Sequence, residues 1–458
     1  MEPPIILPLL FYGIGWIVIE KKQYTAAVYT LGCKVNFYES EAIAEALAAK
    51  GVEIRNFEET CDIYIINTCT VTADSDRKAL RIIRRAVSKN PAALIAVTGC
   101  LAQRKPELIA KIQGVALISG NEDKLSIAER ILAAVSGGAC SPSVSILPFT
   151  DTLGDISIDA FHRTRAYLKI EDGCSSRCAY CIIPKVRGPV RSKTREAVLR
   201  EVRALVRGGC KEIVLTGIEI SSYQFDLMRL LAELDCVEGL ERIRLGSLDP
   251  FFIRKEISDA LCKIQKLCPH FHISLQSGSS KILAAMRRKY NGAAAMENIL
   301  YLKSLFPDCN LFADVITGFP GETEEDFLET VRFIETVRFL HLHIFPYSQR
   351  TGTEAAEMEG QVPRAVKKQR AAQLSEIQAS IKKSILTDTV RSGKKANVLF
   401  ETWKDGFLKG HSENFVEYIC PADRNLRGET GTVVPLHTDG ESITGYLLSS
   451  SSSLSSSS

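Results

Sequence analysis

The chain has 458 residues, of which 45% are hydrophobic and 24% are charged, and its formal net charge at pH 7 is +3. This length predicts two or three domains with sizeable cores, and the small net charge excludes a uniformly basic nucleic-acid-binding protein. The 14 cysteines are scattered through a long α/β pattern, which excludes a small disulfide scaffold. We expect a reducing, cytoplasmic compartment in which the thiols bind metal or act in catalysis.

The two ends of the chain differ in composition from the rest. Residues 5–19 are apolar, but the run is short for a membrane span and lacks the basic start and cleavage site of a signal peptide. We interpret residues 1–23 as an upstream extension or a misplaced start, with a membrane anchor as the minority alternative, and we expect no membrane partner. The serine run over 449–458 predicts a disordered tail.

Residues 24–136 alternate short apolar runs with helical patterns. Strands are predicted over 26–31, 62–67, 93–98 and 115–119, and helices over 39–50, 74–88 and 122–135. This alternation predicts a doubly wound parallel sheet, in which ligands collect at the carboxyl ends of the strands.

A cysteine follows each of the first three predicted strands. These are Cys33, Cys69 and Cys100, each beside turn-forming residues. Because strand ends of a parallel sheet share one edge, we expect the three thiols to converge and to hold an iron–sulfur cluster. The alternative is three packing thiols, since cysteine packs as a small hydrophobe. Packing is also the role we assign to the thiols that match no motif: Cys61, Cys140, Cys210, Cys236, Cys262, Cys268, Cys309 and Cys420.

The second predicted helix carries a run of cations. They are Arg77, Lys78, Arg81, Arg84, Arg85 and Lys89. A solvated helix face is the common explanation of such a run, but few acidic residues lie nearby, and this favours a surface that contacts phosphate.

Residues 137–160 predict a linker, and residues 161–386 predict a second α/β core. Helices are predicted between its strands, for example over 195–207 and 324–337. The six strands are predicted over 166–170, 212–216, 242–246, 271–275, 311–317 and 340–345. Six strand–helix repeats predict an incomplete barrel with a lateral opening for a large substrate.

Three thiols follow the first strand of this core, namely Cys174, Cys178 and Cys181, with three and then two residues between them. A loop of this kind can wrap a four-iron cluster and leave one iron open to another ligand. The alternatives are packing thiols or a zinc site, but zinc would need a fourth ligand close by, and none lies between Gly173 and Ser192.

More cations follow the cysteine loop. They are Arg187, Arg191, Lys193 and Arg195. They are either a plain surface run or contacts to a polyanion that approaches the loop.

These motifs resemble those of radical S-adenosylmethionine (SAM) methylthiotransferases. The resemblance is carried by residues 174–181, with Tyr180 before the last thiol, and by the segments around Cys33, Cys69 and Cys100. It implies a (β/α)6 core in which the open iron of a [4Fe-4S] cluster on Cys174, Cys178 and Cys181 chelates SAM. One-electron reduction then cleaves SAM to a radical that abstracts hydrogen. It also implies a second [4Fe-4S] cluster on the other three cysteines, which carries the sulfur to be transferred.

The same resemblance makes residues at later strand ends candidate contacts of SAM. They are Gly217, Glu219, Ser274, Gln276, Asp314 and Gly318. Glycine at a strand end permits a close approach of the backbone to a ligand, although it is more often simply a turn. Glu219 stands where close relatives carry His.

The carboxyl-terminal part begins with a helical pattern over 363–386, which predicts a connector. Residues 387–448 then change to short β-like runs, at 398–400, 415–419, 432–434 and 442–447. Their position, with residues 410–414 and 428–431, resembles the RNA-binding TRAM module, a small β-barrel. A β-domain that binds nothing is the alternative.

The resemblance covers about residues 24–448. Residues 30–36, Thr-Leu-Gly-Cys-Lys-Val-Asn, are most similar to the enzymes that insert a methylthio group at C2 of N6-threonylcarbamoyladenosine, beside the anticodon of tRNA. The alternatives are the isopentenyladenosine-specific relative, the relative that modifies an aspartate of a ribosomal protein and, in another class, a non-catalytic metal-containing RNA-binding protein. The expected partners are tRNA, a flavodoxin- or ferredoxin-like electron donor and a sulfur donor.

Overall fold

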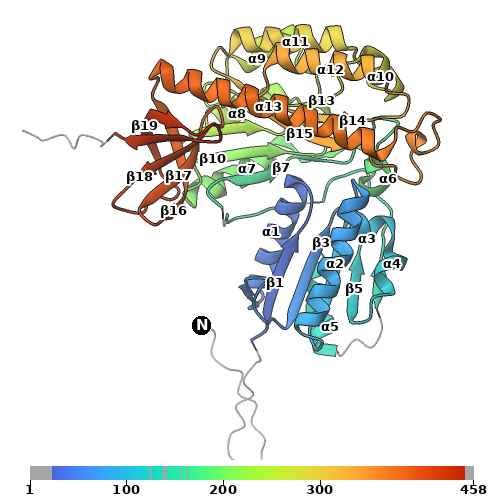
Figure 1. The fold of residues 1–458 in the computed structure, drawn as a ribbon. Coiled ribbons are helices and arrows are strands. Elements are labelled where there is room, and N and C mark those ends of the chain that lie inside the picture. Colours follow the sequence, from blue (N-terminus) through green and yellow to red (C-terminus); the bar gives the residue numbers. More distant parts are fainter. Residues whose placement is uncertain are drawn as a thin grey trace, which may run out of the picture.

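The computed structural model describes residues 23–122, 124, 126–137, 142–154, 156–161 and 163–448. Residues 1–22 of the predicted extension, the serine tail and Cys140 lie outside these residues. Three parts follow one another along the chain: an α/β domain, a larger α/β barrel and a small β-barrel (Figure 1). No helix in the described ranges is long and apolar enough to cross a membrane.

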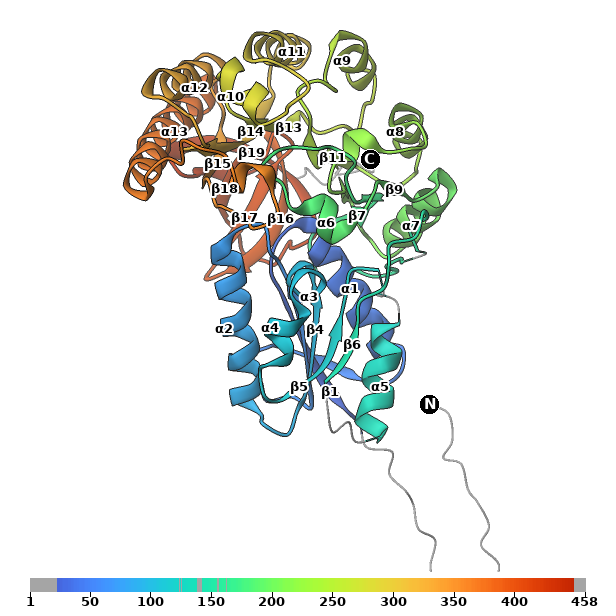
Figure 2. The ribbon, with the colours of Figure 1, turned by 90° about the vertical axis from the view of Figure 1, so that its right-hand side faces the viewer.

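The amino-terminal domain is a six-stranded parallel sheet in the order β2-β1-β3-β4-β5-β6. Its strands are β1 (Thr25–Thr30), β2 (Glu53–Arg55), β3 (Ile63–Thr68), β4 (Leu94–Gly99), β5 (Val115–Ser119) and β6 (Ser143–Ser145). Its helices are α1 (Lys34–Ala48), α2 (Ala73–Lys89), α3 (Cys100–Arg104), α4 (Pro106–Ala110) and α5 (Ile127–Gly137). The apolar residues of α1 and α5 pack on one face of the sheet, and those of α2, α3 and α4 pack on the other (Figure 2). The predicted doubly wound sheet is confirmed.

Two short strands of this sheet were not predicted. β2 and β6 have three residues each, which is too short to show an alternating pattern. β6 comes from the segment predicted as a linker and pairs with β5, so part of that segment belongs to the sheet. α1 begins five residues before the predicted start, because the chain turns into the helix directly after Cys33.

The central part is an open barrel of six parallel strands. They are β7 (Ala166–Lys169), β10 (Glu212–Thr216), β11 (Arg242–Leu245), β13 (His270–Gln276), β14 (Asn310–Thr317) and β15 (His341–Pro346). β7, β10 and β11 pair in one group. The short strand β12 (Ser247–Leu248), which follows β11, pairs with β13 in a second group with β14 and β15, and a bridge from Ile243 to Leu267 also joins the groups. In the described part of the chain β7 and β15 do not pair. The predicted incomplete (β/α)6 barrel is therefore confirmed, with its opening between these two strands.

Helices cover the outside of the barrel as an arc, and the amino-terminal domain lies across its open side (Figure 2). The helices of the arc are α7 (Arg195–Arg207), α8 (Leu227–Asp235), α9 (Lys255–Leu261), α10 (Ser280–Ala285), α11 (Gly292–Leu305), α12 (Glu324–Val337) and α13 (Arg364–Ser392). α13 extends six residues beyond the predicted connector.

Alternate residues of the barrel strands face the helices and the lumen. On β14, for example, Leu311, Ala313 and Val315 belong to the apolar core under the helices, whereas Asp314 between them does not. Because side chains alternate across a strand, the intervening residues face inward. These inward residues are largely polar or charged, so the lumen is built to hold a polar ligand.

The last part is a closed β-barrel, as predicted. Its strands are β16 (Ala396–Lys404), β17 (Phe407–Ser412), β18 (Glu417–Pro421), β19 (Thr430–Thr438) and β20 (Ile443–Leu447). β17 was not predicted, because Lys409, Gly410 and His411 interrupt its apolar pattern.

The loop after β17 closes the amino-terminal mouth of the central barrel. The ring of Phe415 stacks on His270, with a centroid separation of 4.7 Å, and lies under the guanidinium groups of Arg244 and Arg165. Arg242 and Arg244 also donate hydrogen bonds to backbone carbonyls of residues 397 and 411–413. Residues 410–414, which predicted an RNA-binding module, thus form part of the contact between domains.

Candidate functional site

Cys33, Cys69 and Cys100, hereafter the auxiliary cysteines, lie at the carboxyl ends of three neighbouring strands. Cys33 follows β1 and caps α1, Cys69 follows β3, and Cys100 follows β4 and starts α3. The order β1-β3-β4 places these ends side by side. The thiols are close enough to interact electrostatically with one another. Cys33 is the exposed member, and the other two are buried.

The surroundings of the auxiliary cysteines fit a cluster held by three thiolates. Gly32 has φ +101°, and a Cβ atom on it would lie 2.9 Å from Cβ and 3.1 Å from Sγ of Cys69. Glycine at this turn therefore lets Cys69 approach the turn before Cys33. Burial raises the pKa of Cys69 to about 12, so the thiolate needs a compensating positive charge, which bound iron provides.

Cys174, Cys178 and Cys181, hereafter the radical-cluster cysteines, lie in the loop between β8 (Glu171–Asp172) and α6 (Ile183–Arg187). All three are half-buried. Gly173 starts this loop with φ +86°, and a Cβ atom there would lie 1.9 Å from the Pro189 carbonyl oxygen, so no other residue fits. The backbone N–H of Ser176 donates to Cys174 Sγ at 3.4 Å, and Arg288 Nη1 donates to Cys178 Sγ at 3.3 Å. Both donors stabilise thiolates, as cluster ligation requires.

The two sets of cysteines meet across α6. Cys100 packs against Ile182 and Val186, which directly follow the radical-cluster cysteines in the chain. Asn121 Nδ2 donates to the Val186 carbonyl at 2.7 Å and lies 3.7 Å from Cys100 Sγ. One short helix thus separates two three-thiol sites that are more than 70 residues apart in sequence.

A buried network of charges fixes this arrangement. Glu39 on α1 pairs with Arg187, Lys169 and Lys124, at 2.9, 2.8 and 3.1 Å. Arg187 and Lys169 also pair with Asp172, at 2.9 and 2.7 Å. Burial alone would raise the pKa of Glu39 and of Asp172, but Arg187 and the lysines lower both. The network joins the amino-terminal domain to the barrel beside both sets of cysteines.

Three of the four cations that follow the cysteine loop, Arg187, Arg191 and Lys193, are therefore buried and point inward. Arg191 pairs with Glu122, and Lys193 pairs with Glu201 and donates to the Tyr38 hydroxyl at 2.7 Å. A surface run and a polyanion contact are both wrong for these two residues and for Arg187, because protein carboxylates already neutralise them.

Three of the predicted SAM contacts, Gly217, Glu219 and Ser274, lie at the rim of the barrel near Cys178. The backbone N–H of Glu219 donates to Glu171 Oε2 at 2.8 Å, and a Cβ atom on Gly217 would lie 2.5 Å from the same oxygen. Burial raises the pKa of Glu171 to about 9, and burial with neighbouring Asp249 raises that of Glu219 to about 7. Carboxyl groups held in this way suit a cationic ligand group, whose arrival would favour their ionisation.

Sequence reasoning missed four residues of this rim: Glu171, Asp249, Arg288 and Tyr290. Arg288 Nη2 donates to Asp249 Oδ2 at 2.6 Å and to the Ser274 carbonyl at 3.4 Å, while its Nη1 reaches Cys178. The Tyr290 hydroxyl donates to the carbonyls of Ser274 and Leu275. No local motif marks these residues, because partners such as Cys178 and Asp249 lie far from Arg288 in the chain.

Asp314 and Gly318, two other predicted SAM contacts, have different neighbours. Asp314 lies deeper in the lumen, where its Oδ1 is 3.0 Å from His272 Nε2. The N–H of Gly318 donates to Glu322, and a Cβ atom on Gly318 would meet Lys367 of α13 at 2.4 Å. Gly318 is therefore a turn packed against α13. Gln276 is buried at the end of β13 with φ +67°.

Most of the thiols assigned to packing are buried, but Cys236 and Cys262 are exposed. Neither lies at a strand end of either sheet. Packing is therefore the wrong role for these two thiols, and they belong to neither three-thiol site.

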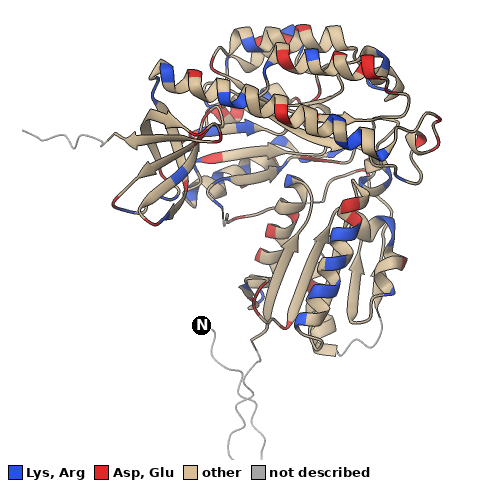
Figure 3. Ribbon diagram, viewed as in Figure 1, with Lys and Arg blue, Asp and Glu red and all other residues tan. Residues whose placement is uncertain are grey.

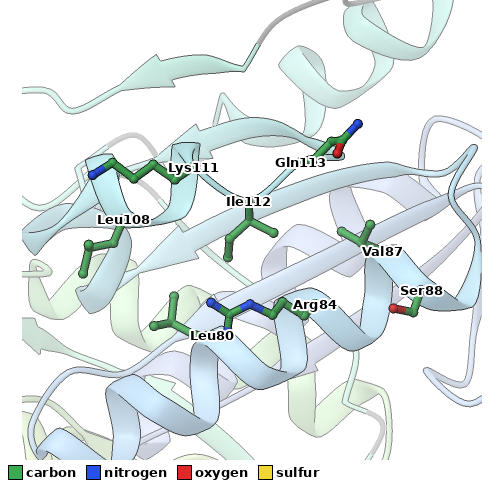
Figure 4. A pocket seen from close by; sticks show the side chains of 8 residues that line it. All are labelled: Leu80, Arg84, Val87, Ser88, Leu108, Lys111, Ile112 and Gln113. Carbon is green, nitrogen blue, oxygen red and sulfur yellow. The ribbon is translucent and has the colours of Figure 1, made fainter.

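The cations of α2 form a visible stripe (Figure 3). Arg77 pairs with Asp74, and Arg85 and Lys89 pair with Glu58. Lys78, Arg81 and Arg84 are exposed and have no ion pair within the described ranges. Beside Arg84, a hollow of about 560 Å³ lies between α2 and α4 (Figure 4). Leu80, Leu108 and Lys111 also line it, on the outer face of the domain, so it does not belong to the cysteine sites.

Comparisons with known proteins agree with the two-part site. The family model of the radical SAM superfamily matches residues 168–334, and the model of uncharacterized protein family UPF0004 matches residues 25–120. Each set of cysteines falls within one of these matches.

Two curated relatives are threonylcarbamoyladenosine tRNA methylthiotransferases MtaB. The protein from Bacillus subtilis (strain 168) is 40% identical over 88% of this chain and 92% of its own length. The protein from Aquifex aeolicus (strain VF5) is 38% identical over 77% of this chain and 87% of its own length. A tRNA-2-methylthio-N(6)-dimethylallyladenosine synthase from the same Aquifex strain is 35% identical over 92% of this chain and 98% of its own length.

A solved structure with a similar fold is the radical S-adenosylmethionine methyltransferase TsrM from Kitasatospora setae. Its TM-score is 0.57 at 14% sequence identity, and the match covers 73% of this chain and 77% of that chain. At this identity the likeness extends to the fold alone.

Proposed function

We propose that this chain, which belongs to the methylthiotransferase family of radical SAM enzymes, inserts a methylthio group at C2 of N6-threonylcarbamoyladenosine beside the anticodon of tRNA. The main structural support for this class of reaction is that the two sets of cysteines lie on either side of the short helix α6. The substrate is supported by the relatives named for it, which match at 38% and 40% identity. The dimethylallyladenosine synthase matches at 35% and is the second candidate.

The two sets of cysteines would have different roles in the reaction. The radical-cluster cysteines would hold the [4Fe-4S] cluster that binds SAM, and the auxiliary cysteines the [4Fe-4S] cluster that carries sulfur. When bound, these groups supply one-electron reduction of SAM, abstraction of hydrogen from a strong C–H bond, and the sulfur that is transferred. Arg288 stabilises the Cys178 thiolate and holds Asp249 at the rim. Glu171, Glu219 and Asp249 would attract the cationic part of SAM.

The barrel restricts how a nucleotide reaches these sites. Phe415 and its neighbours close the amino-terminal mouth of the lumen. The substrate base must therefore enter from the carboxyl ends of the strands or through the opening between β7 and β15. The first turn of α1 follows Cys33 and lies beside this opening. Its Phe37 ring is near the ring of Tyr167 on β7, one of the two strands that border the opening, with the ring centroids 6.4 Å apart. A base inserted here would lie between the two sets of cysteines.

The partners follow from the reaction. We propose tRNA as the substrate, with Lys78, Arg81 and Arg84 as contacts to its phosphates, since they are the exposed and unpaired cations of α2 among the described residues. The chemistry requires an electron donor, which we expect to be flavodoxin- or ferredoxin-like, and a sulfur donor. Cytoplasmic location stays a prediction.

The proposal is tested with reconstituted protein, SAM and a reductant. Two anticodon stem-loops are offered, one carrying threonylcarbamoyladenosine and one carrying isopentenyladenosine, and their nucleosides are analysed by mass spectrometry. We expect the methylthio product on the first RNA alone. A product on the isopentenyl RNA alone would transfer the assignment to the second candidate. SAM cleavage without a methylthio product on either RNA would refute both.

A further inference from the structure

Three inward-facing side chains form a cluster halfway down the barrel lumen: His272 on β13, Asp314 on β14 and His343 on β15. One atom from each residue lies within 4.8 Å of those of the other two. His272 Nε2 lies 3.0 Å from Asp314 Oδ1, and its Nδ1 is 3.5 Å from Ser247 Oγ. The His343 ring lies 5.1 Å from that of His272 and 4.7 Å from that of His341. The cluster plays no part in the two cysteine sites.

Lys34 reaches this cluster from another domain. It is the first residue of α1 and follows Cys33 directly. Its ammonium group interacts electrostatically with Asp314, Arg244 and Arg165, and with the His343 ring. These partners lie on or next to strands all around the lumen, so the side chain enters through the lateral opening of the barrel. Within the described ranges the side chain of Lys34 makes no ion pair and no hydrogen bond, although the residue is half-buried.

The charges at and below Lys34 leave the lower part of the lumen positive. Below it, Arg165, Arg242 and Arg244 face Glu212, and Arg165 also pairs with Glu401. With Lys34 and Asp314 included, four cations face three carboxylates. His343 adds no charge near neutral pH, because burial and neighbouring His272 lower its pKa to about 4.

This excess of positive charge determines which kind of ligand the cluster can bind. Two histidines and a carboxylate are also the donor set of a divalent metal site. However, Lys34 and Arg244 would repel a cation, whereas a carboxylate would neutralise the surplus and give the ammonium a partner. The site is therefore suited to an anion.

We propose that Lys34, with His343 as a hydrogen-bond donor, binds the carboxylate of the threonyl group on the substrate base. This inference rests on the proposed function and names the residues that select its substrate. Because Lys34 follows Cys33, a carboxylate bound there holds the base close to the auxiliary cysteines. An uncharged isopentenyl group would leave the half-buried ammonium unpaired, which disfavours it.

The test compares two stem-loop RNAs that differ in one group, the threonyl carboxylate or its uncharged carboxamide. Binding is measured by fluorescence anisotropy on reconstituted protein without reductant, so that no turnover occurs. We expect the wild-type protein to prefer the carboxylate by roughly 10- to 100-fold, the worth of one hydrogen bond to a charged group. Lys34→Met should bind both RNAs equally, and Lys34→Arg should keep most of the preference. Lys50→Met, just beyond the other end of α1, is the matched control and should keep all of it.

His343→Phe provides a second test, because this residue is far in sequence from every cysteine assigned to a cluster. It should reduce the preference several-fold while the iron content stays at the wild-type value. An undiminished preference in Lys34→Met, or in His343→Phe if Lys34→Met fails to take up iron, would overturn the inference. A wild-type protein that methylthiolates neither RNA would instead contradict the proposed function, and this outcome is scored separately by mass spectrometry.

Discussion

Replacing Glu39 by Gln tests whether the buried charge network holds the two domains together. Gln keeps the size of the side chain, so the change creates no cavity. It removes the carboxylate that pairs with Arg187, Lys169 and Lys124. Arg187 and Lys169 keep only Asp172, and Lys124 loses the carboxylate it pairs with. Removing one partner of a buried pair costs about 3–5 kcal/mol, because the remaining charge is uncompensated. We expect a loss of this size for Glu39→Gln.

The assay is urea unfolding of the reconstituted protein at pH 7, under anaerobic conditions. Glu129→Gln is the control, since Glu129 pairs with Lys50 on the surface and such changes alter stability by about 0.5 kcal/mol or less. Glu39 has a pKa well below its usual value, so its contribution is present above the unfolded pKa of about 4.3 and is lost as the pH falls below it. The difference between wild type and variant should therefore persist from pH 6 to 8 and shrink below roughly pH 4.

Glu39→Gln should also separate two activities. Glu39 and Lys124 belong to the amino-terminal domain, whereas Lys169, Asp172 and Arg187 belong to the barrel. Weakening the network loosens one domain against the other, so methylthiolation should fall more than SAM cleavage. A loss of stability below about 1 kcal/mol, with both activities intact, would refute the reasoning, because the network would then be neutral.

Three further predictions concern the cysteines and the RNA surface. Changing all three radical-cluster cysteines to Ala should abolish SAM cleavage and remove about half of the iron, and undiminished cleavage would contradict their assignment. Changing the three auxiliary cysteines to Ala should preserve SAM cleavage but abolish methylthiolation, and any methylthio product would contradict their role. Changing Lys78, Arg81 and Arg84 to Ala should weaken tRNA binding and reduce the slope of log affinity against log salt by up to about 3. An unchanged slope would mean that these residues do not contact phosphate and form an ordinary solvated helix face.

The strand ends were the most predictable part of the structure. Strands such as β5 and β10 have the predicted bounds, because each is a short apolar run between clear turn signals. Since parallel strands end at one edge, the sequence was enough to expect that Cys33, Cys69 and Cys100 come together. The strands that were missed had two or three residues, as in β8 and β2, or an interrupted pattern, as in β17.

The partners of charged residues were not predictable. The sequence alone does not distinguish a basic residue that faces water from one that pairs with a buried carboxylate. Arg187 lies 148 positions from Glu39 in the chain, and Arg191 lies 69 from Glu122. Only the docking of the amino-terminal domain on the barrel brings these pairs together. For the same reason, nothing in the segment around Lys34 indicated that this residue enters the lumen of another domain.

Because Arg187, Arg191 and Lys193 are neutralised by carboxylates inside the protein, we expect affinity for RNA and choice of the modified base to depend on different residues. The exposed cations of α2 can meet phosphates of any tRNA, whereas Lys34 can meet only a group inserted into the lumen. The two sets should therefore be separable. Changing Lys78, Arg81 and Arg84 should lower the affinity for the carboxylate and carboxamide RNAs by the same factor and reduce the salt slope for both. Changing Lys34 should abolish the preference between these RNAs, because the two carry the same phosphates.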